Sequence, residues 1–133
     1  MIRYAPYSIT DGGRDKAGFT TERNDCTVRA IAIAGQIDYK DAHDLVQWHG
    51  RRNKGKTYNS TPLIDSLFPN CRLESLAGLS RCQWTLGQFL KQKLAGRFIC
   101  FKRGHAFAVI DAIVYDLGTM GTKTKLSQIW KVG

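Results

Sequence analysis

Cys26 is the residue whose type and position could perform nucleophilic chemistry. It follows Asn24 and Asp25, two good helix N-cap residues, and begins an alanine-rich segment, 26–34, that Gly35 ends. The first turn of a helix offers unpaired backbone N–H groups and the positive end of the helix dipole. Both lower the pKa of a thiol, and the N–H groups can also stabilise an oxyanion. Cys26 is therefore a candidate nucleophile; the alternative is a buried cysteine on an apolar helix.

His105 and Asp116 could complete an acyl-transfer site. His105 follows a glycine and begins an apolar stretch, so its imidazole can project from a strand end toward a facing helix terminus, as a general base must. Antiparallel pairing through a turn at 111–112 predicts that residues 115–116 return beside residues 105–106. A carboxylate there could orient the imidazole and stabilise the imidazolium. The alternatives are a strand-end histidine bonded to a backbone carbonyl and a turn-forming aspartate.

The elements that must position these side chains are helices first and strands second. Caps and apolar spacing predict helices over 26–34, 39 to about 50, 62–68 with Ser60 or Thr61 as the cap, and 86 to about 94. Short apolar runs between turn residues predict strands over 97–101, 105–110 and 113–115, while 126–132 could be a last strand or a helical turn. Residues 1–23 indicate a loop with at most one short strand. This order predicts an α+β fold with helices packed on a C-terminal antiparallel β-meander.

Length and composition are those of one globular domain, residues 1–133. The chain is 43% hydrophobic, which excludes a disordered tail or a low-complexity linker. No apolar run approaches the ~18 residues of a membrane helix, and residues 1–16 are polar and charged, so we expect a cytoplasmic protein without membrane span or secretory signal. The four cysteines form no CxxC pair and fit no zinc module, so we expect free thiols, no metal and no cofactor.

The charge balance fits either an acidic or polyanionic partner or the ordinary solubility of a basic protein. The chain has 20 Lys and Arg against 11 Asp and Glu, a net charge of +9. One basic loop, flanked by Trp48 and Tyr58, could contact phosphates and stack a base. Its basic residues are Arg51, Arg52, Lys54 and Lys56. No zinc-finger, helix-turn-helix or RNA-recognition signature accompanies this loop, so nucleic-acid binding stays open beside the alternative of a solvated loop.

The order of a cysteine at a helix start, a histidine at a strand start and an aspartate at the end of the next strand resembles the papain-like cysteine peptidase superfamily. The stretch 104–116 looks like the histidine strand and the following strand of its small bacterial and phage-encoded members. The first motif is similar to the ovarian-tumour (OTU) deubiquitinase branch, whose cysteine helix commonly has the pattern Asp-Gly-Asn-Cys-x-x-Arg-Ala-Ile. The matching residues are Cys26, Arg29, Ala30 and Ile31.

The resemblance implies a single papain-like domain, encoded by a phage or mobile element, with a catalytic triad. Cys26 would be the nucleophile, His105 the base and Asp116 the residue that orients the base. Asn24, or alternatively Asn70, would supply a side-chain amide to an oxyanion hole that the Cys26 backbone N–H begins. The implied activity is that of a thiol hydrolase on a peptide bond, an isopeptide bond or a glutamine side chain of a protein or peptide substrate, in the host cytoplasm.

A second hypothesis is a catalytically weak or inactive protein on the same fold. Such a protein would bind a host protein or a nucleic acid through its basic surface. Two departures from the family patterns favour it: Arg23 stands where the OTU branch places an aspartate, and Thr20 where papain places a glutamine. Thiol reactivity separates the two hypotheses, because a pure binder needs no lowered pKa at Cys26.

Overall fold

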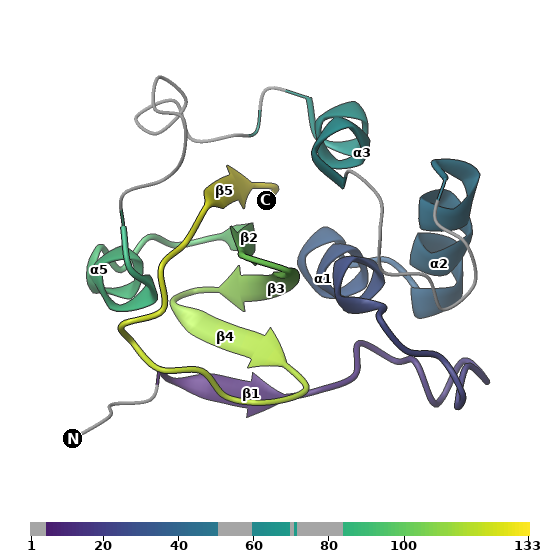
Figure 1. Ribbon diagram of the computed structural model, residues 1–133, viewed down its shortest axis with the longest axis horizontal. Helices are drawn as coiled ribbons and strands as arrows, with labels where there is room; N and C mark the ends of the chain where they lie inside the picture. The colour runs from purple at the N-terminus through teal and green to yellow at the C-terminus, as the bar shows by residue number, and fades with distance from the viewer. Residues whose placement is uncertain (1–4, 51–59, 70, 72–83) are drawn as a thin grey trace.

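The structure is a computed structural model that describes residues 5–50, 60–69, 71 and 84–133. In these residues, four helices and a five-stranded mixed sheet form an α+β fold. The helices α1 (Cys26–Gly35) and α2 (Tyr39–Trp48) lie on one side of the sheet, and α5 (Leu86–Lys91) lies on the other (Figure 1). The helix α3 (Ser60–Leu67) packs on the α1 side through Leu63 and Ile64.

The sheet has the strand order β1-β4-β3-β2-β5. Its strands are β1 (Tyr7–Ile9), β2 (Arg97–Lys102), β3 (His105–Ile110), β4 (Ile113–Asp116) and β5 (Gln128–Lys131). The predicted antiparallel meander is formed by β2, β3 and β4, and β5 pairs antiparallel with β2. In addition, β1, which lies in the segment expected to be a loop with at most one short strand, pairs parallel with β4, so the complete sheet is mixed. The strand β1 has only three residues, all of them exposed, and a run this short gives no periodicity from which its pairing could be predicted.

The helices occupy their predicted positions and differ mainly at their ends. The helix α2 ends at Trp48 rather than near residue 50, and α5 ends at Lys91 rather than near residue 94. The start of α5 is fixed by a capping box. In it, Thr85 Oγ1 accepts the Gln88 N–H at 3.2 Å, and Gln88 Oε1 accepts the Thr85 N–H at 2.9 Å.

Alternation along β3 divides the core into two layers. Ala106 and Ala108 pack against α1, while Phe107 and Val109 belong to the layer shared with α5. All four side chains are buried, and the two alanines leave room for the apolar helix α1 to approach the sheet closely. Because β3 is packed from both sides, the strand holds its first residue, His105, in a defined place.

The helix α1 ends one residue later than the sequence predicts. Gly35 remains helical, and Gln36 takes the left-handed conformation at φ 55°. The Ile37 N–H donates to the Ala32 carbonyl at 3.1 Å and the Gln36 N–H to the Ile33 carbonyl at 3.3 Å, which is the Schellman pattern. Gln36 therefore occupies the position for which this motif favours glycine.

Replacing Gln36 with glycine is expected to raise the free energy of unfolding by about 0.5–1 kcal/mol, because glycine adopts a left-handed conformation without a steric penalty. Urea unfolding of both proteins measures the change. Gln36→Ala is the matched control, since alanine removes the same polar atoms but keeps the Cβ, and it should bring no gain. An equal gain from both variants would contradict a backbone origin.

Candidate active site

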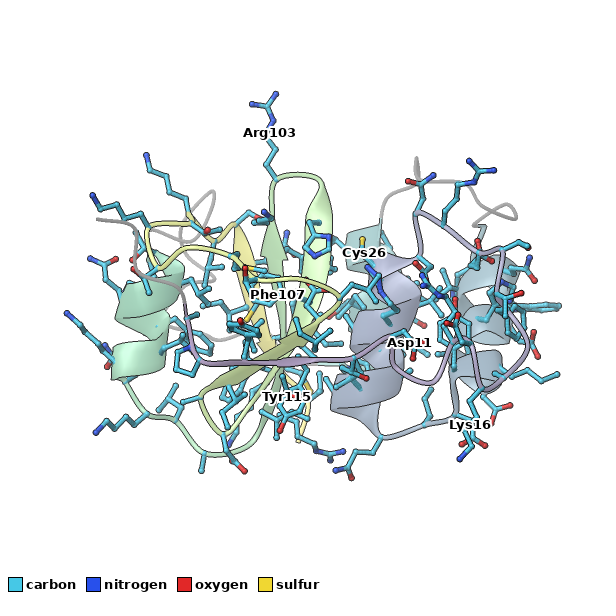
Figure 2. All side chains as sticks on the ribbon, turned by 90° about the horizontal axis from the view of Figure 1, so that it is seen from below. Asp11, Lys16, Cys26, Arg103, Phe107 and Tyr115 are labelled. Atoms are coloured by element: carbon cyan, nitrogen blue, oxygen red, sulfur yellow. The ribbon has the colours of Figure 1, made fainter. Side chains whose placement is uncertain are left out.

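Cys26 is the first residue of α1 and lies where β3 begins. Its side chain is half-buried, and its thiol forms hydrogen bonds with the His105 side chain and with the Ala106 backbone. Figure 2 shows the Cys26 sulfur at the end of the molecule from which the β2–β3 turn, with Arg103, projects. The structure therefore brings together the helix start and the strand start that the sequence singles out.

The surroundings of Cys26 favour its thiolate form. Burial alone raises the pKa of the thiol, because a charged sulfur is poorly solvated there. The hydrogen bonds from His105 and Ala106 lower the pKa, as do the positive charges of His105 and Arg29, and together they bring it below its ordinary value. The first turn of α1 acts in the same direction through its unpaired N–H groups.

Asp116 holds the imidazole of His105 through a short hydrogen bond. The Nε2 atom of His105 and the Oδ2 atom of Asp116 are 2.6 Å apart. The other carboxylate oxygen, Oδ1, accepts the Leu117 N–H at 2.8 Å, so the carboxylate cannot turn freely. Because Nε2 is engaged by Asp116, Nδ1 is the nitrogen left for the Cys26 thiol. The arrangement is that of a nucleophile, a base and an orienting acid.

The strand register that produces this contact differs by two residues from the prediction. Ala108 pairs with Tyr115, so continuing the register puts Asp116 opposite Phe107 rather than beside residue 105. The turn itself is the expected two-residue turn at 111–112, with both φ angles positive as in the type I′ turn of tight hairpins. Pairing across it puts Ile110 opposite Ile113, and counting on from that pair gives the observed register. His105 and Asp116 are thus diagonal neighbours on one face, within reach of two long polar side chains.

The same contacts stabilise the charged form of His105. The hydrogen bond to Asp116 raises the pKa of His105 most, and the bond to Cys26 raises it further, whereas burial lowers it; the result is a pKa of about 9. At neutral pH the imidazole is therefore protonated, and the neighbouring thiol ionises more readily than an ordinary cysteine. A thiolate–imidazolium pair of this kind has an activated nucleophile and a proton donor already in place.

Arg29 connects the carboxylate of Asp116 to a second buried acid. Its Nη2 atom lies 3.8 Å from Asp116 Oδ1, and its Nη1 atom lies 3.4 Å from Asp25 Oδ1. Arg29 is only 7% exposed. The sequence reasoning gave Arg29 no role in the site, although a single charge within the otherwise apolar segment 26–34 was a signal for one.

Asp25 has a different role from the one that the sequence predicts. It stands at the N-cap position of α1, but its side chain makes no capping hydrogen bond. Its Oδ2 atom accepts the Tyr39 hydroxyl at 2.8 Å, and its Oδ1 atom lies 3.4 Å from both Arg14 Nη1 and Arg29 Nη1. The expected side-chain cap is wrong because this buried carboxylate is turned toward two cations and a phenol, which compensate its lost hydration.

A cavity of about 300 Å³ opens beside Cys26 and His105. Asn24, the predicted oxyanion residue, lines this cavity and is exposed, with a left-handed backbone at φ 54°. Cys26 also lines this cavity, and its backbone N–H has no acceptor within α1 because it is the first residue of the helix. On the opposite wall, Thr61 of α3 donates to Gln128 of β5 at 3.3 Å. The cavity can therefore admit a carbonyl group next to the thiol.

The basic loop, Asn70 and Cys82 lie outside the described residues; the loop's basic side chains are Arg51, Arg52, Lys54 and Lys56. Where the chain is described, no three His, Cys, Asp or Glu side chains gather as a metal ion would require. None of the helices in those parts is long and apolar enough to cross a membrane. Cys26, Cys71 and Cys100 are free thiols.

Comparisons with family models, with curated proteins and with solved structures returned no match for this chain.

Proposed function

We propose that this protein is a cysteine hydrolase with a papain-like site, in which Cys26 is the nucleophile, His105 the acid–base group and Asp116 its orienting partner. The substrate class is an amide: a peptide bond, an isopeptide bond or a glutamine side chain. The single observation that carries the proposal is the chain of contacts from Asp116 Oδ2 through His105 Nε2, at 2.6 Å, to the thiol of Cys26.

The reaction has two halves. In the first, the Cys26 thiolate attacks the carbonyl carbon, a sulfur–carbon bond forms, and the carbonyl oxygen becomes an oxyanion near the Cys26 N–H and Asn24. The carbon–nitrogen bond then breaks while the His105 imidazolium gives its proton to the leaving amine. In the second half, His105 takes a proton from water, the resulting hydroxide attacks the thioester, and the Cys26 thiolate leaves.

The first test is the pH dependence of Cys26 alkylation by iodoacetamide, read by peptide mass spectrometry in the wild type and in His105→Ala. We expect Cys26 to react selectively at about pH 6, well below the ~8.5 at which a free cysteine titrates. In His105→Ala the rate at that pH should fall at least about tenfold, because burial would then raise the thiol pKa with no imidazolium to oppose it.

Cys71 and Cys100 serve as internal controls in every digest, since one is half-buried and the other fully buried. Labelling of Cys26 no faster than that of Cys71 would contradict an activated thiolate. The conclusion would then be a binding module without turnover. For any amide that the wild type cleaves, Cys26→Ser should abolish turnover while leaving the unfolding curve unchanged, and residual turnover at the wild-type rate would exclude Cys26 as nucleophile.

A further inference from the structure

His105 lines two hollows. One is the cavity beside Cys26 already described, here the Cys26 hollow. The other, the Asp116 hollow, has a volume of about 420 Å³ and lies on the Arg29 and Asp116 side. Lys102, Arg103, Gly104 and His105, which form the β2–β3 turn and its flanks, line both. A substrate that occupies both hollows would therefore contact the β2–β3 turn in each of them.

Positively charged side chains predominate among the residues that line these two hollows. Lys102 and Arg103 bring two positive charges, whereas the charge of the protonated His105 is balanced by the neighbouring Cys26 thiolate and by Asp116. Among the described residues, no acidic side chain lines the Cys26 hollow. The Asp116 hollow has one, Asp116, and its carboxylate is already bonded to His105 and paired with Arg29. A cleft lined by one sign of charge concentrates ligands of the opposite sign.

The geometry of the hairpin indicates on which side of the reacting bond a negative group would lie. Lys102 is paired with His105 across the β2–β3 hairpin, so both side chains start from the same face of the sheet, about 5 Å apart at their Cβ atoms. In the proposed reaction His105 gives its proton to the leaving amine, so the amine half of the substrate passes His105 and Lys102. Arg103, exposed at the turn, projects beyond the end of the molecule (Figure 2).

We infer that the substrate carries a carboxylate on the amine side of the bond that is cleaved, bound by Lys102 with Arg103 as a steering charge. This inference rests on the proposed function. The carboxylate belongs to a peptide chain, either as an Asp or Glu side chain that follows the cleaved bond or as the free α-carboxylate of the leaving residue. Both are the same chemical group, and both suit an ammonium and a guanidinium at the mouth of a polar cleft.

The test compares two alkylating reagents of the same size on the full chain: iodoacetate, which is an anion, and iodoacetamide, which is neutral. In each reaction the Cys26 thiolate attacks the methylene carbon and iodide leaves. The readout is the ratio of the iodoacetate rate to the iodoacetamide rate at Cys26, divided by the same ratio at Cys71. A ratio cancels any change in the thiolate fraction, which affects both reagents equally. We expect the divided ratio to exceed one clearly.

In the double variant Lys102→Gln/Arg103→Gln the divided ratio should fall by about fivefold, which corresponds to two unit charges about 8 Å from the reagent in a water-like dielectric. Ionic strength near 1 M, where the Debye length is about 3 Å, should reduce the wild-type ratio in the same direction. The matched control is Lys91→Gln, which removes an exposed lysine at the end of α5 and should leave the ratio unchanged.

The outcomes separate this inference from the proposed function. Slow alkylation of Cys26 by both reagents would overturn the proposed function. Fast alkylation by iodoacetamide, with a divided ratio near one or with no change in the double variant, would overturn this inference and leave the activated thiolate standing.

A digest of a mixed peptide library, read by mass spectrometry, then distinguishes the two sources of the carboxylate. Enrichment of Asp or Glu directly after internal cleavage sites identifies an acidic side chain as the ligand. Cleavage confined to the last bond of each peptide identifies the terminal α-carboxylate. Cleavage without either preference, or a preference that persists in Lys102→Gln/Arg103→Gln, would overturn the inference, and a library left intact would overturn the proposed peptide-bond cleavage together with it.

Discussion

In the Asp116→Asn variant, the pKa of His105 is expected to fall from about 9 toward the ordinary histidine value of 6.5. The amide keeps the size of the carboxylate but loses its negative charge and one of its two acceptor oxygens, and the bond to Asp116 is the largest cause of the raised pKa. A raised pKa means that the folded protein retains the imidazolium between pH 6.5 and about 9. The variant should lose it in this window, as NMR titration of the imidazole would show.

The loss of the imidazolium has a second consequence at the thiol. Without a positive charge beside it, Cys26 should ionise at higher pH, and at pH values below the thiol pKa its alkylation rate should fall about tenfold for each unit by which that pKa rises. The matched control is Asp111→Asn, the same change in the same hairpin. Asp111 Oδ1 accepts the Gly96 N–H at 2.8 Å, away from the thiol. In this control, the pKa of His105 and the pH dependence of Cys26 alkylation should therefore stay as in the wild type.

An unchanged His105 titration in Asp116→Asn would mean that Cys26 alone holds the imidazolium, and the role of Asp116 would be structural. A further comparison tests this. In Cys26→Ser the bond to Asp116 remains, so the pKa of His105 should stay above 6.5. The pair of variants therefore assigns the raised pKa of His105 to one partner or to both.

Replacing Arg29 with alanine is expected to lower the free energy of unfolding by about 3 kcal/mol, the size typical of breaking a buried ion pair from one side. The side chains of Arg29, Asp25 and Asp116 are 8%, 2% and 8% exposed, so the two carboxylates would lose a cation that solvent cannot replace. Asp25 would keep Arg14 and Tyr39. Urea unfolding measures the change.

Arg14→Ala is the matched control for this loss. Its guanidinium also contacts Asp25 at 3.4 Å, but its side chain is 17% exposed and closer to solvent, so the loss should be about 1 kcal/mol. A loss of that small size in Arg29→Ala would contradict the importance of the buried link.

Arg29→Lys separates stability from positioning, because lysine keeps one positive charge but cannot contact both acids with a planar fork. If Arg29 positions Asp116, His105 in this folded variant should titrate below about 9, since the carboxylate would be free to move away from the imidazole. If Arg29 is only structural, the Arg29→Lys variant should have a lower free energy of unfolding but an unchanged pKa of His105.

Local signals in the sequence determined the elements of this fold. The apolar segment after Asp25 predicted α1 with Cys26 at its start, and the glycine before His105 predicted where β3 begins. These predictions succeed because helix starts and tight turns depend on residues within one turn of each other. The order of Cys26, His105 and Asp116 along those elements was sufficient to nominate three side chains that lie in one chain of contacts in the structure.

The partners of the charged side chains were decided only by the tertiary structure. Asp25 had the right type and place for a helix cap, and it is turned instead toward Arg14, Arg29 and Tyr39, which come from three separate parts of the chain. The parallel pairing of β1 with β4 joins residues 7–9 to residues 114–116. Contacts between distant segments leave no periodic pattern in the sequence, because burial and charge compensation select them only after the layers have packed.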